Sequence, residues 1–201
     1  LLNPDNTLSA RIWYQSASRN LPVPIISPAQ NPPENQDDES LRAMVSYTSN
    51  LNEADIGITA AFIADRLRYN NELASIRSVN NSRTFTLKGS YKRRINGFIL
   101  MEAAFNDELS HVSTSNYNGN KSRNLASFDL LAESMPVSWL SARLLVRELL
   151  HDDKLLTPDF SLSTEFRPFS RKYYFFKASV SKNSKVPTLN DMYWSPGGNP
   201  D

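Results

Sequence analysis

Apolar and polar residues alternate along most of this chain with a period of two, the pattern of β-strands that have one apolar and one polar face. In segment 84–92 the odd positions carry Phe, Leu, Gly and Tyr, and the even positions carry only Thr, Lys and Ser. Segment 159–167 divides in the same way. Seven weaker segments share the pattern, at 8–14, 41–47, 56–64, 99–105, 126–132, 140–146 and 174–180. The pattern therefore predicts an all-β fold of about nine strands.

The connections between these segments alternate between long and short. The short ones, of about 3 to 5 residues, contain turn formers such as Asn96-Gly97 and Pro136. The first long one, 21–39, contains five prolines and an acidic cluster, so we expect a loop there. An antiparallel up-and-down meander with short turns at one end and long loops at the other is typical of an outer-membrane barrel. A soluble sandwich gives no reason for this asymmetry.

One segment fits two kinds of structure. Residues 140–156 contain several leucines and other good helix formers at helical spacing, and they also alternate between apolar and polar positions in their first half. We favour a strand for that first half. His151-Asp152-Asp153-Lys154 is then predicted to be an external loop.

Composition and charge exclude several classes of function. The 201 residues include 22 basic and 21 acidic side chains, a net charge of +1, so nothing indicates a nucleic-acid partner. There are no cysteines and two histidines, which excludes disulfides, thiolate zinc sites and cysteine nucleophiles. No apolar run approaches the roughly 18 residues of a membrane-spanning helix. That argument does not apply to β-barrels, whose strands are apolar on one face only.

The acidic residues do not form a convincing catalytic or metal site. Asp37-Asp38-Glu39 and Asp152-Asp153 offer oxygen ligands for calcium, but no EF-hand spacing accompanies them, and solvated loop charge is the favoured interpretation. Asp159 and Glu165 on one strand would lie roughly 20 Å apart, too far for a glycosidase pair. We therefore expect neither an enzyme nor a bound cofactor or metal.

The end of the chain carries the most specific signal. Residues 185–201 read KVPTLNDMYWSPGGNPD and follow an aromatic strand. This run resembles a motif of TonB-dependent outer-membrane receptors, in which a barrel strand continues into an external loop. The matching positions are Pro187, Thr188, Asp191, Met192, Tyr193, Gly198, Asn199, Pro200 and Asp201. The family usually has Arg and Ala where Lys185 and Val186 stand, and its following Leu, Pro and Glu lie beyond this chain.

The resemblance implies a fold and an activity. Residues 1–201 would form a partial β-barrel domain, nine of about 22 strands, with the plug domain and the remaining strands absent from this chain. We read both chain ends as cuts in a longer protein. Such receptors sit in the bacterial outer membrane and import a scarce large ligand with energy from TonB. The sequence of the motif is similar to that of vitamin B12 receptors, so a cobalamin or a siderophore-like iron chelate is the expected ligand. The implied partners are TonB through the plug, outer-membrane lipid, the external small molecule and, as a further candidate, a surface lipoprotein.

Candidate site residues follow from the same assignment. Tyr193 and Trp194 are candidates to stack on an aromatic or macrocyclic ligand, with Asn199 as a third contact. The alternative is that the motif organises the loop, because it recurs in receptors of different specificity. Residues 116–120 are read as a flexible loop tip, with His111 beside it as a solvated histidine. Inward-facing charges that are candidates to pair with the plug are Arg11, Lys88, Glu102, Asp129, Arg143, Arg147, Glu165 and Lys177.

A different class of function remains open at this point. A soluble all-β binding or adhesion module would also produce alternating strands and polar loops, although it would not account for the C-terminal motif.

Overall fold

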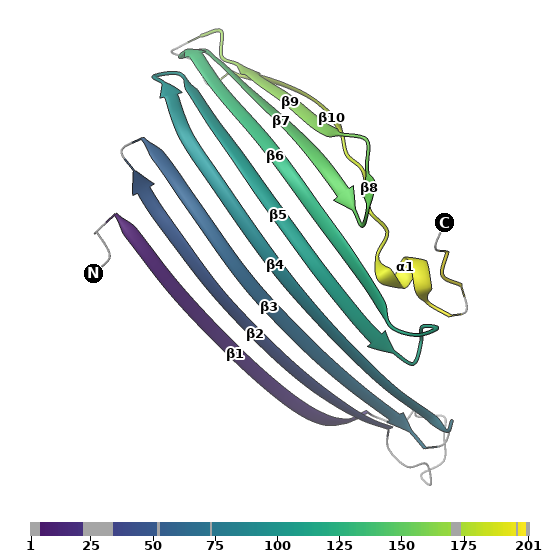
Figure 1. Ribbon diagram of the computed structural model, residues 1–201. Coiled ribbons are helices and arrows are strands. Elements are labelled where there is room, and N and C mark those ends of the chain that lie inside the picture. Colours follow the sequence, from purple (N-terminus) through teal and green to yellow (C-terminus); the bar gives the residue numbers. More distant parts are fainter. Residues whose placement is uncertain are drawn as a thin grey trace.

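The computed structural model describes residues 5–21, 34–51, 53–72, 74–169, 174–195 and 197–199. These residues form one antiparallel sheet in which each strand pairs with its neighbours in sequence, in the order β1 to β7, then β9 and β10, while β8 pairs with β7 alone (Figure 1). The sheet is open between β1 and β10. The strands are β1 Asn6–Leu21, β2 Glu34–Leu51, β3 Ala54–Asn71, β4 Ile76–Asn96, β5 Ile99–Thr114, β6 Lys121–Val137, β7 Leu140–His151, β8 Lys154–Leu155, β9 Asp159–Phe166 and β10 Phe176–Lys182.

The all-β prediction and the up-and-down order are confirmed. Seven of the nine predicted segments lie wholly within a strand, while 159–167 and 174–180 extend one and two residues beyond β9 and β10. Residues 140–151 are strand throughout, not helix. The structure adds β8, which follows the turn at Asp152 and Asp153. Asp152 has a φ of 52°, a left-handed conformation that Asp adopts more readily than most residues. This tight turn stands where an external loop was predicted.

The prediction of long loops is wrong for the connections from β3 to β4 and from β5 to β6. The connection between β3 and β4 is only 72–75, and that between β5 and β6 is 115–120. The polar stretches are strand extensions in register with their neighbours, such as Arg68 opposite Val79. Alternation is weak there because neither face of these extensions is consistently apolar. Residues 34–39, predicted as loop, belong to β2, while the five prolines of the same connection lie outside the described residues.

The two ends of the sheet differ in the length of their connections and in the elements that lie there. Connections of two residues join β2 to β3, β4 to β5 and β6 to β7 at the upper left of Figure 1. The extended hairpins β3–β4 and β5–β6 project at the lower right. The short helix α1 (Leu189–Tyr193) lies at this same end of the sheet.

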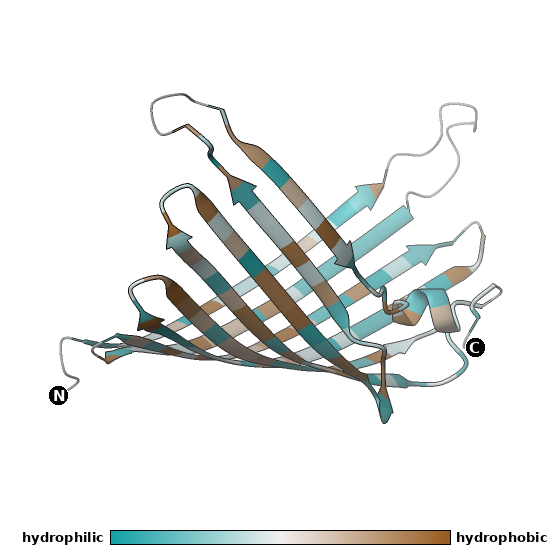
Figure 2. Cartoon of the chain, turned by 90° about the horizontal axis from the view of Figure 1, so that it is seen from above, coloured by the Kyte–Doolittle hydropathy of each residue, from teal (hydrophilic) through white to brown (hydrophobic). Residues whose placement is uncertain are grey.

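The sheet is bent into an open trough, so it has one concave and one convex face (Figure 2). Among the described residues, no large side chain is fully buried, and most of the large apolar side chains on the strands are exposed. The one buried apolar cluster in the described part of the chain consists of Tyr117, Leu189 and Met192, where α1 meets the β5–β6 connection. The sheet is therefore not held by a central core.

Candidate functional site

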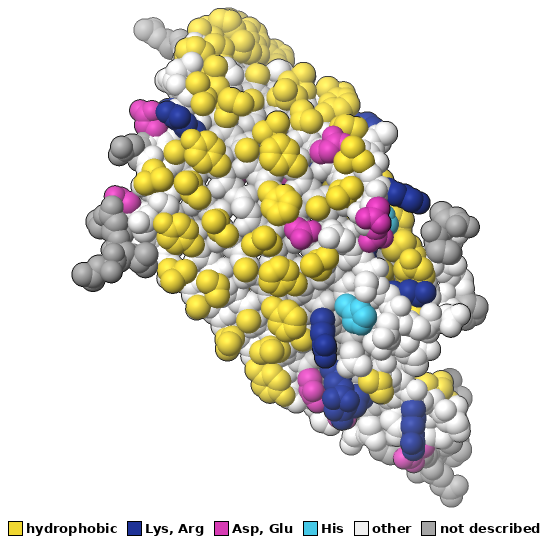
Figure 3. Space-filling view, viewed as in Figure 1, with side chains coloured by type: hydrophobic (Ala, Val, Ile, Leu, Met, Phe, Trp, Pro, Cys, Tyr) yellow, Lys and Arg dark blue, Asp and Glu magenta, His cyan; other side chains and the backbone are white. Residues whose placement is uncertain are grey.

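The convex face carries a continuous band of apolar side chains, which we call the outer belt (Figure 3). It covers the strands but leaves the projecting hairpin ends polar. Two of its residues are charged, Asp107 and Glu148. The outer belt consists of alternate positions in 8–14 on β1, 41–47 on β2, 56–64 on β3, 85–91 on β4, 101–109 on β5, 126–132 on β6, 142–150 on β7, 160–166 on β9 and 176–180 on β10.

The outer belt does not follow the hydrogen-bonded rows of the sheet. One row of register partners crosses all nine long strands: Asn6, Ser49, Ile56, Tyr91, Ala103, Leu130, Val146, Phe160 and Lys182. The row is polar at its β1 and β2 end, apolar across the middle, and charged at β10. On β1 the row lies at one edge of the belt, and on β10 it lies at the opposite edge.

This displacement gives the angle between the strands and the belt. Relative to the row, the centre of the belt shifts along the strands by about nine residues over the eight steps from β1 to β10. This is about one residue per strand. With about 3.3 Å per residue and 4.8 Å between strands, this shift means that the strands are tilted by roughly 40° from the line perpendicular to the belt. Strands in transmembrane barrels are tilted by about 35–45°.

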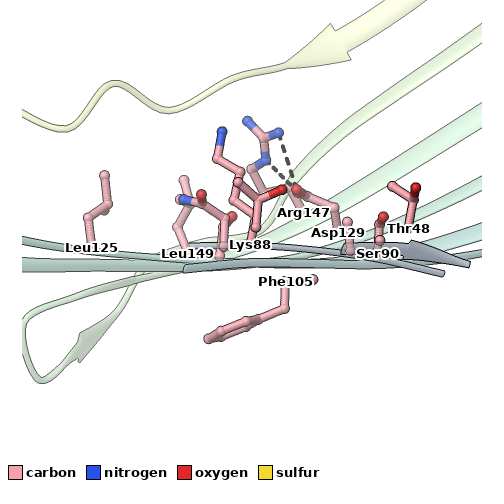
Figure 4. Close-up of a pocket in the computed structure, with 14 residues that line it drawn as sticks. Thr48, Lys88, Ser90, Phe105, Leu125, Asp129, Arg147 and Leu149 are labelled. Carbon is pink, nitrogen blue, oxygen red and sulfur yellow. Dashed lines mark hydrogen bonds and ion pairs between the residues drawn. The ribbon is translucent and has the colours of Figure 1, made fainter. Parts of the chain in front are cut away.

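The concave face is polar and contains several ion pairs. Figure 4 shows Lys88, Asp129 and Arg147 on this face, with Phe105 pointing the opposite way into the outer belt. Arg147 Nε donates to Asp129 Oδ1 at 2.5 Å. These residues line a shallow hollow of about 590 Å³, which also contains small residues such as Gly57 and Ser90.

Several of the predicted inward charges have an ion-pair partner within the sheet. Arg143 lies 3.1 Å from Glu133, and Lys177 lies 3.0 Å from Glu165. Strand alternation places Arg11 and Glu102 on the same concave face, without an ion pair to any described residue. These charges thus share the concave face of the sheet, whereas an inward position in a closed barrel and pairing with a plug stay predictions.

The segment after β10 folds back onto the β5–β6 connection. Arg123, itself 3.1 Å from Glu108, donates to the carbonyl of Pro187, and the backbone N–H of Ser195 donates to the carbonyl of Asn116. Because β7 pairs with β6 only up to Leu125, the outer end of β6 would otherwise be a bare sheet edge. The returning segment lies beside this free end.

Helix α1 is held by its own cap and by the β5–β6 connection. Thr188 and Asp191 form a capping box, in which each side chain accepts from the other's backbone N–H. Tyr117 packs against Leu189 and Met192, and its hydroxyl donates to the side-chain carbonyl of Asn190. The helix was not predicted, although the spacing of Thr188 and Asp191 is a capping signal that sequence reasoning could have used.

The three candidate ligand residues lie in different surroundings. The Tyr193 ring is half-buried, 6.3 Å from the Tyr117 ring, with Lys121 Nζ 4.5 Å from its centroid. Trp194 is 46% exposed. Asn199 donates its backbone N–H to the carbonyl of Asp191. Tyr193 and Asn199 therefore hold the segment together. The exposed side chain of Trp194 is the better candidate to contact a ligand.

Gly198 is expected to tolerate no side chain. A Cβ there would lie 2.6 Å from the backbone N of Trp194 and 2.7 Å from the Met192 carbonyl oxygen. We expect Gly198→Ala to destabilise the returning segment by about 1–3 kcal/mol, measured as faster hydrogen exchange of the Ser195 and Asn199 amides. Gly97→Ala is the control, since no atom lies within 4 Å of a Cβ there. Equal exchange in the two variants would contradict the prediction.

The stabilisation of α1 by its capping box should depend on pH. Hydrogen bonds from the backbone N–H and side chain of Thr188 hold the pKa of Asp191 below its ordinary value of 3.8. Because the folded pKa is the lower one, the cap's contribution is present above pH 3.8 and is lost as pH falls through the folded pKa. We expect Trp194 fluorescence to change only below pH 3.8, and Asp191→Asn to remove the transition. A midpoint above that value would contradict the prediction.

The remaining polar candidates have local roles. Asp37 accepts from Ser18, Asp38 pairs with Arg19, and Asp152 accepts from the backbone N–H of Asn124. His111 Nδ1 lies 2.8 Å from Ser122 Oγ. Within the described parts of the chain, no three His, Asp or Glu side chains gather where they could hold a metal ion.

No helix among the described residues is long and apolar enough to cross a membrane. Comparison with protein-family models and with curated proteins finds no match for this chain.

Proposed function

We propose that this chain is part of the wall of a transmembrane β-barrel in a TonB-dependent outer-membrane receptor. The observation that carries the proposal is the outer belt, which crosses the sheet at a constant angle to the strands. A flat or soluble sheet has no reason to displace its apolar residues by about one position at every strand. A band perpendicular to the axis of a barrel with tilted strands requires that displacement.

The height of the belt supports the same proposal. On β3 it runs from Ile56 to Ala64, which at a tilt of roughly 40° corresponds to about 20 Å along the barrel axis. The apolar band of outer-membrane barrels is about 25 Å tall. Beyond the belt on this strand come Arg66 and Arg68, which suit the polar side of a membrane interface.

The two faces have the chemistry that the proposal requires. Lipid would cover the exposed apolar side chains of the convex face, and the polar concave face would line the interior. The projecting hairpins and the returning segment would stand on the outer side and present Trp194 to a ligand. The resemblance of residues 185–201 to the receptor motif supplies the assignment to active import of a cobalamin or a siderophore-like iron chelate. No covalent chemistry is involved.

The barrel can be tested on the full-length protein in its native membrane. We expect extraction only by detergent, and gel mobility that changes on heating because the barrel unfolds. Release from cells without detergent, together with heat-independent mobility, would favour the soluble binding module instead.

The transport role needs a separate measurement. Cells that express the full-length protein should take up labelled cyanocobalamin or a ferric siderophore only when TonB is present. Uptake that is equal in cells lacking TonB would refute the receptor assignment and leave the barrel standing.

A further inference from the structure

Three basic side chains stand side by side on the convex face, at the margin of the outer belt. They are Arg66 on β3, Arg83 on β4 and His111 on β5, and we call them the basic row. Each is the first residue of its face beyond the outer belt, at the end where the hairpins project. Figure 3 shows basic side chains gathered at this margin. All three strands lie inside the sheet, with a hydrogen-bonded neighbour on both sides.

The strand register brings the basic row together. Arg83 is directly opposite His111, and Arg66 is two residues from Ala64, which is also opposite Arg83. His111 Nδ1 in turn lies 2.8 Å from Ser122 Oγ on β6. Cross-strand and diagonal neighbours on one face lie about 5–8 Å apart. A single phosphate group can therefore contact long side chains from two neighbouring strands of the row.

The two arginines of the basic row lack a counter-charge. Both are exposed, and neither side chain forms an ion pair or a hydrogen bond with any residue the structure describes. Glu39 is opposite Arg66 on β2, but it lies 3.4 Å from the guanidinium of Arg68. Two neighbouring guanidinium groups without a carboxylate favour phosphate, which accepts paired hydrogen bonds from each of them.

The rows on either side of the basic row differ in polarity. On the side of the outer belt, Phe62, Phe85 and Leu109 are register partners, and the last two are 42% and 47% exposed. On the side of the hairpin tips, the register partners Asn81 and Ser113 offer an amide and a hydroxyl group. From the belt toward the tips, the surface is therefore apolar, then basic, then polar and uncharged.

We propose that the basic row and the two rows beside it form a binding site for a phosphorylated glycolipid of the outer leaflet. The acyl chains of this lipid lie on Phe85 and Leu109, and its phosphate pairs with Arg66 and Arg83. Its sugar hydroxyls meet the polar row beyond. The inference deepens the proposed function and rests on it, because it requires the convex face to stand in a membrane with the hairpins outside.

The order of the three rows selects this class of lipid. Free phosphate would use the basic row alone and leave the exposed apolar row in water. A phospholipid such as phosphatidylglycerol has acyl chains and a phosphate, but its headgroup beyond the phosphate is small. A phosphorylated sugar carries several hydroxyl groups past the phosphate, at the level where Asn81 and Ser113 lie.

The test is lipid binding to the full-length protein in detergent micelles, measured by native mass spectrometry with lipid A as the probe. We expect Arg66→Gln/Arg83→Gln to weaken lipid A binding at least about tenfold. The matched control is Arg93→Gln/Arg94→Gln, which removes the same charge at the other end of β4. Arg93 has Ala54 and Met101 as register partners, so no second basic side chain stands opposite it. The control is expected to bind lipid A like the unmodified protein.

The outcomes separate this inference from the barrel itself. Heat-dependent gel mobility of each variant shows that its barrel has formed. If that mobility is kept and lipid A does not bind, or binds equally to both double variants, the lipid site is refuted and the barrel stands. Phosphatidylglycerol that binds as tightly as lipid A also refutes the glycolipid site. Absence of heat-dependent mobility in the unmodified protein refutes both proposals.

Discussion

Leu87→Arg in the full-length protein, refolded into lipid vesicles, is expected to lower the free energy of unfolding by about 2–4 kcal/mol. Leu87 lies inside the outer belt on β4, between Phe85 and Gly89 of the same face. A guanidinium there must enter hydrocarbon or pull water and headgroups toward it. The measurement is urea unfolding in vesicles, followed by tryptophan fluorescence.

The adjacent residue provides the control. Thr86 faces the concave side, opposite Ala61 and Glu108, so Thr86→Arg places the same side chain in a polar interior near a carboxylate. We expect its effect to stay within about 0.5 kcal/mol. If the two variants lose equal stability, the convex face is not in contact with lipid.

Tyr117→Ala is expected to release the returning segment while leaving the sheet intact. Tyr117 is 8% exposed, packs against Leu189 and Met192, and donates a hydrogen bond to Asn190. Removing its ring should cost about 2–4 kcal/mol of local stability, a large share of what holds α1 in place. We expect amides 190–195 to lose protection against hydrogen exchange, with amides 99–110 of β5 unchanged.

Tyr117→Phe separates the ring from the hydroxyl. It keeps the packing and removes only the hydrogen bond to Asn190, so the expected loss is about 1 kcal/mol. If Tyr117→Ala and Tyr117→Phe behave alike, packing does not anchor the segment. If Tyr117→Ala also exposes β5, the segment is not an independent unit.

Sequence reasoning succeeded where one face of a strand is apolar and the other polar. Segments such as 84–92 are of this kind, so the strands and their order could be predicted from alternation alone. It failed where neither face is consistently apolar, as in 65–71, because nothing local distinguishes a hydrated strand from a loop. Those extensions form because each residue continues a register that the apolar part has already fixed.

The candidate site was predictable only in part. The C-terminal motif directed attention to Tyr193, Trp194 and Asn199, but their roles depend on partners far away in sequence. Tyr193 meets Tyr117 and Lys121 only because the chain turns back after β10. Local spacing carries no information on such a contact.

The strand extensions lower the conformational-entropy cost of binding a ligand at the outer end. Ordering a free loop takes about 1–2 kcal/mol of backbone conformational entropy per residue, so a loop of fifteen residues would oppose binding by tens of kcal/mol. Here most of the residues between the belt and the hairpin tips are already fixed in hydrogen-bonded ladders. A ligand that lands on these tips therefore meets a surface whose ordering took place during folding, and little of its interaction energy is spent on immobilising the protein.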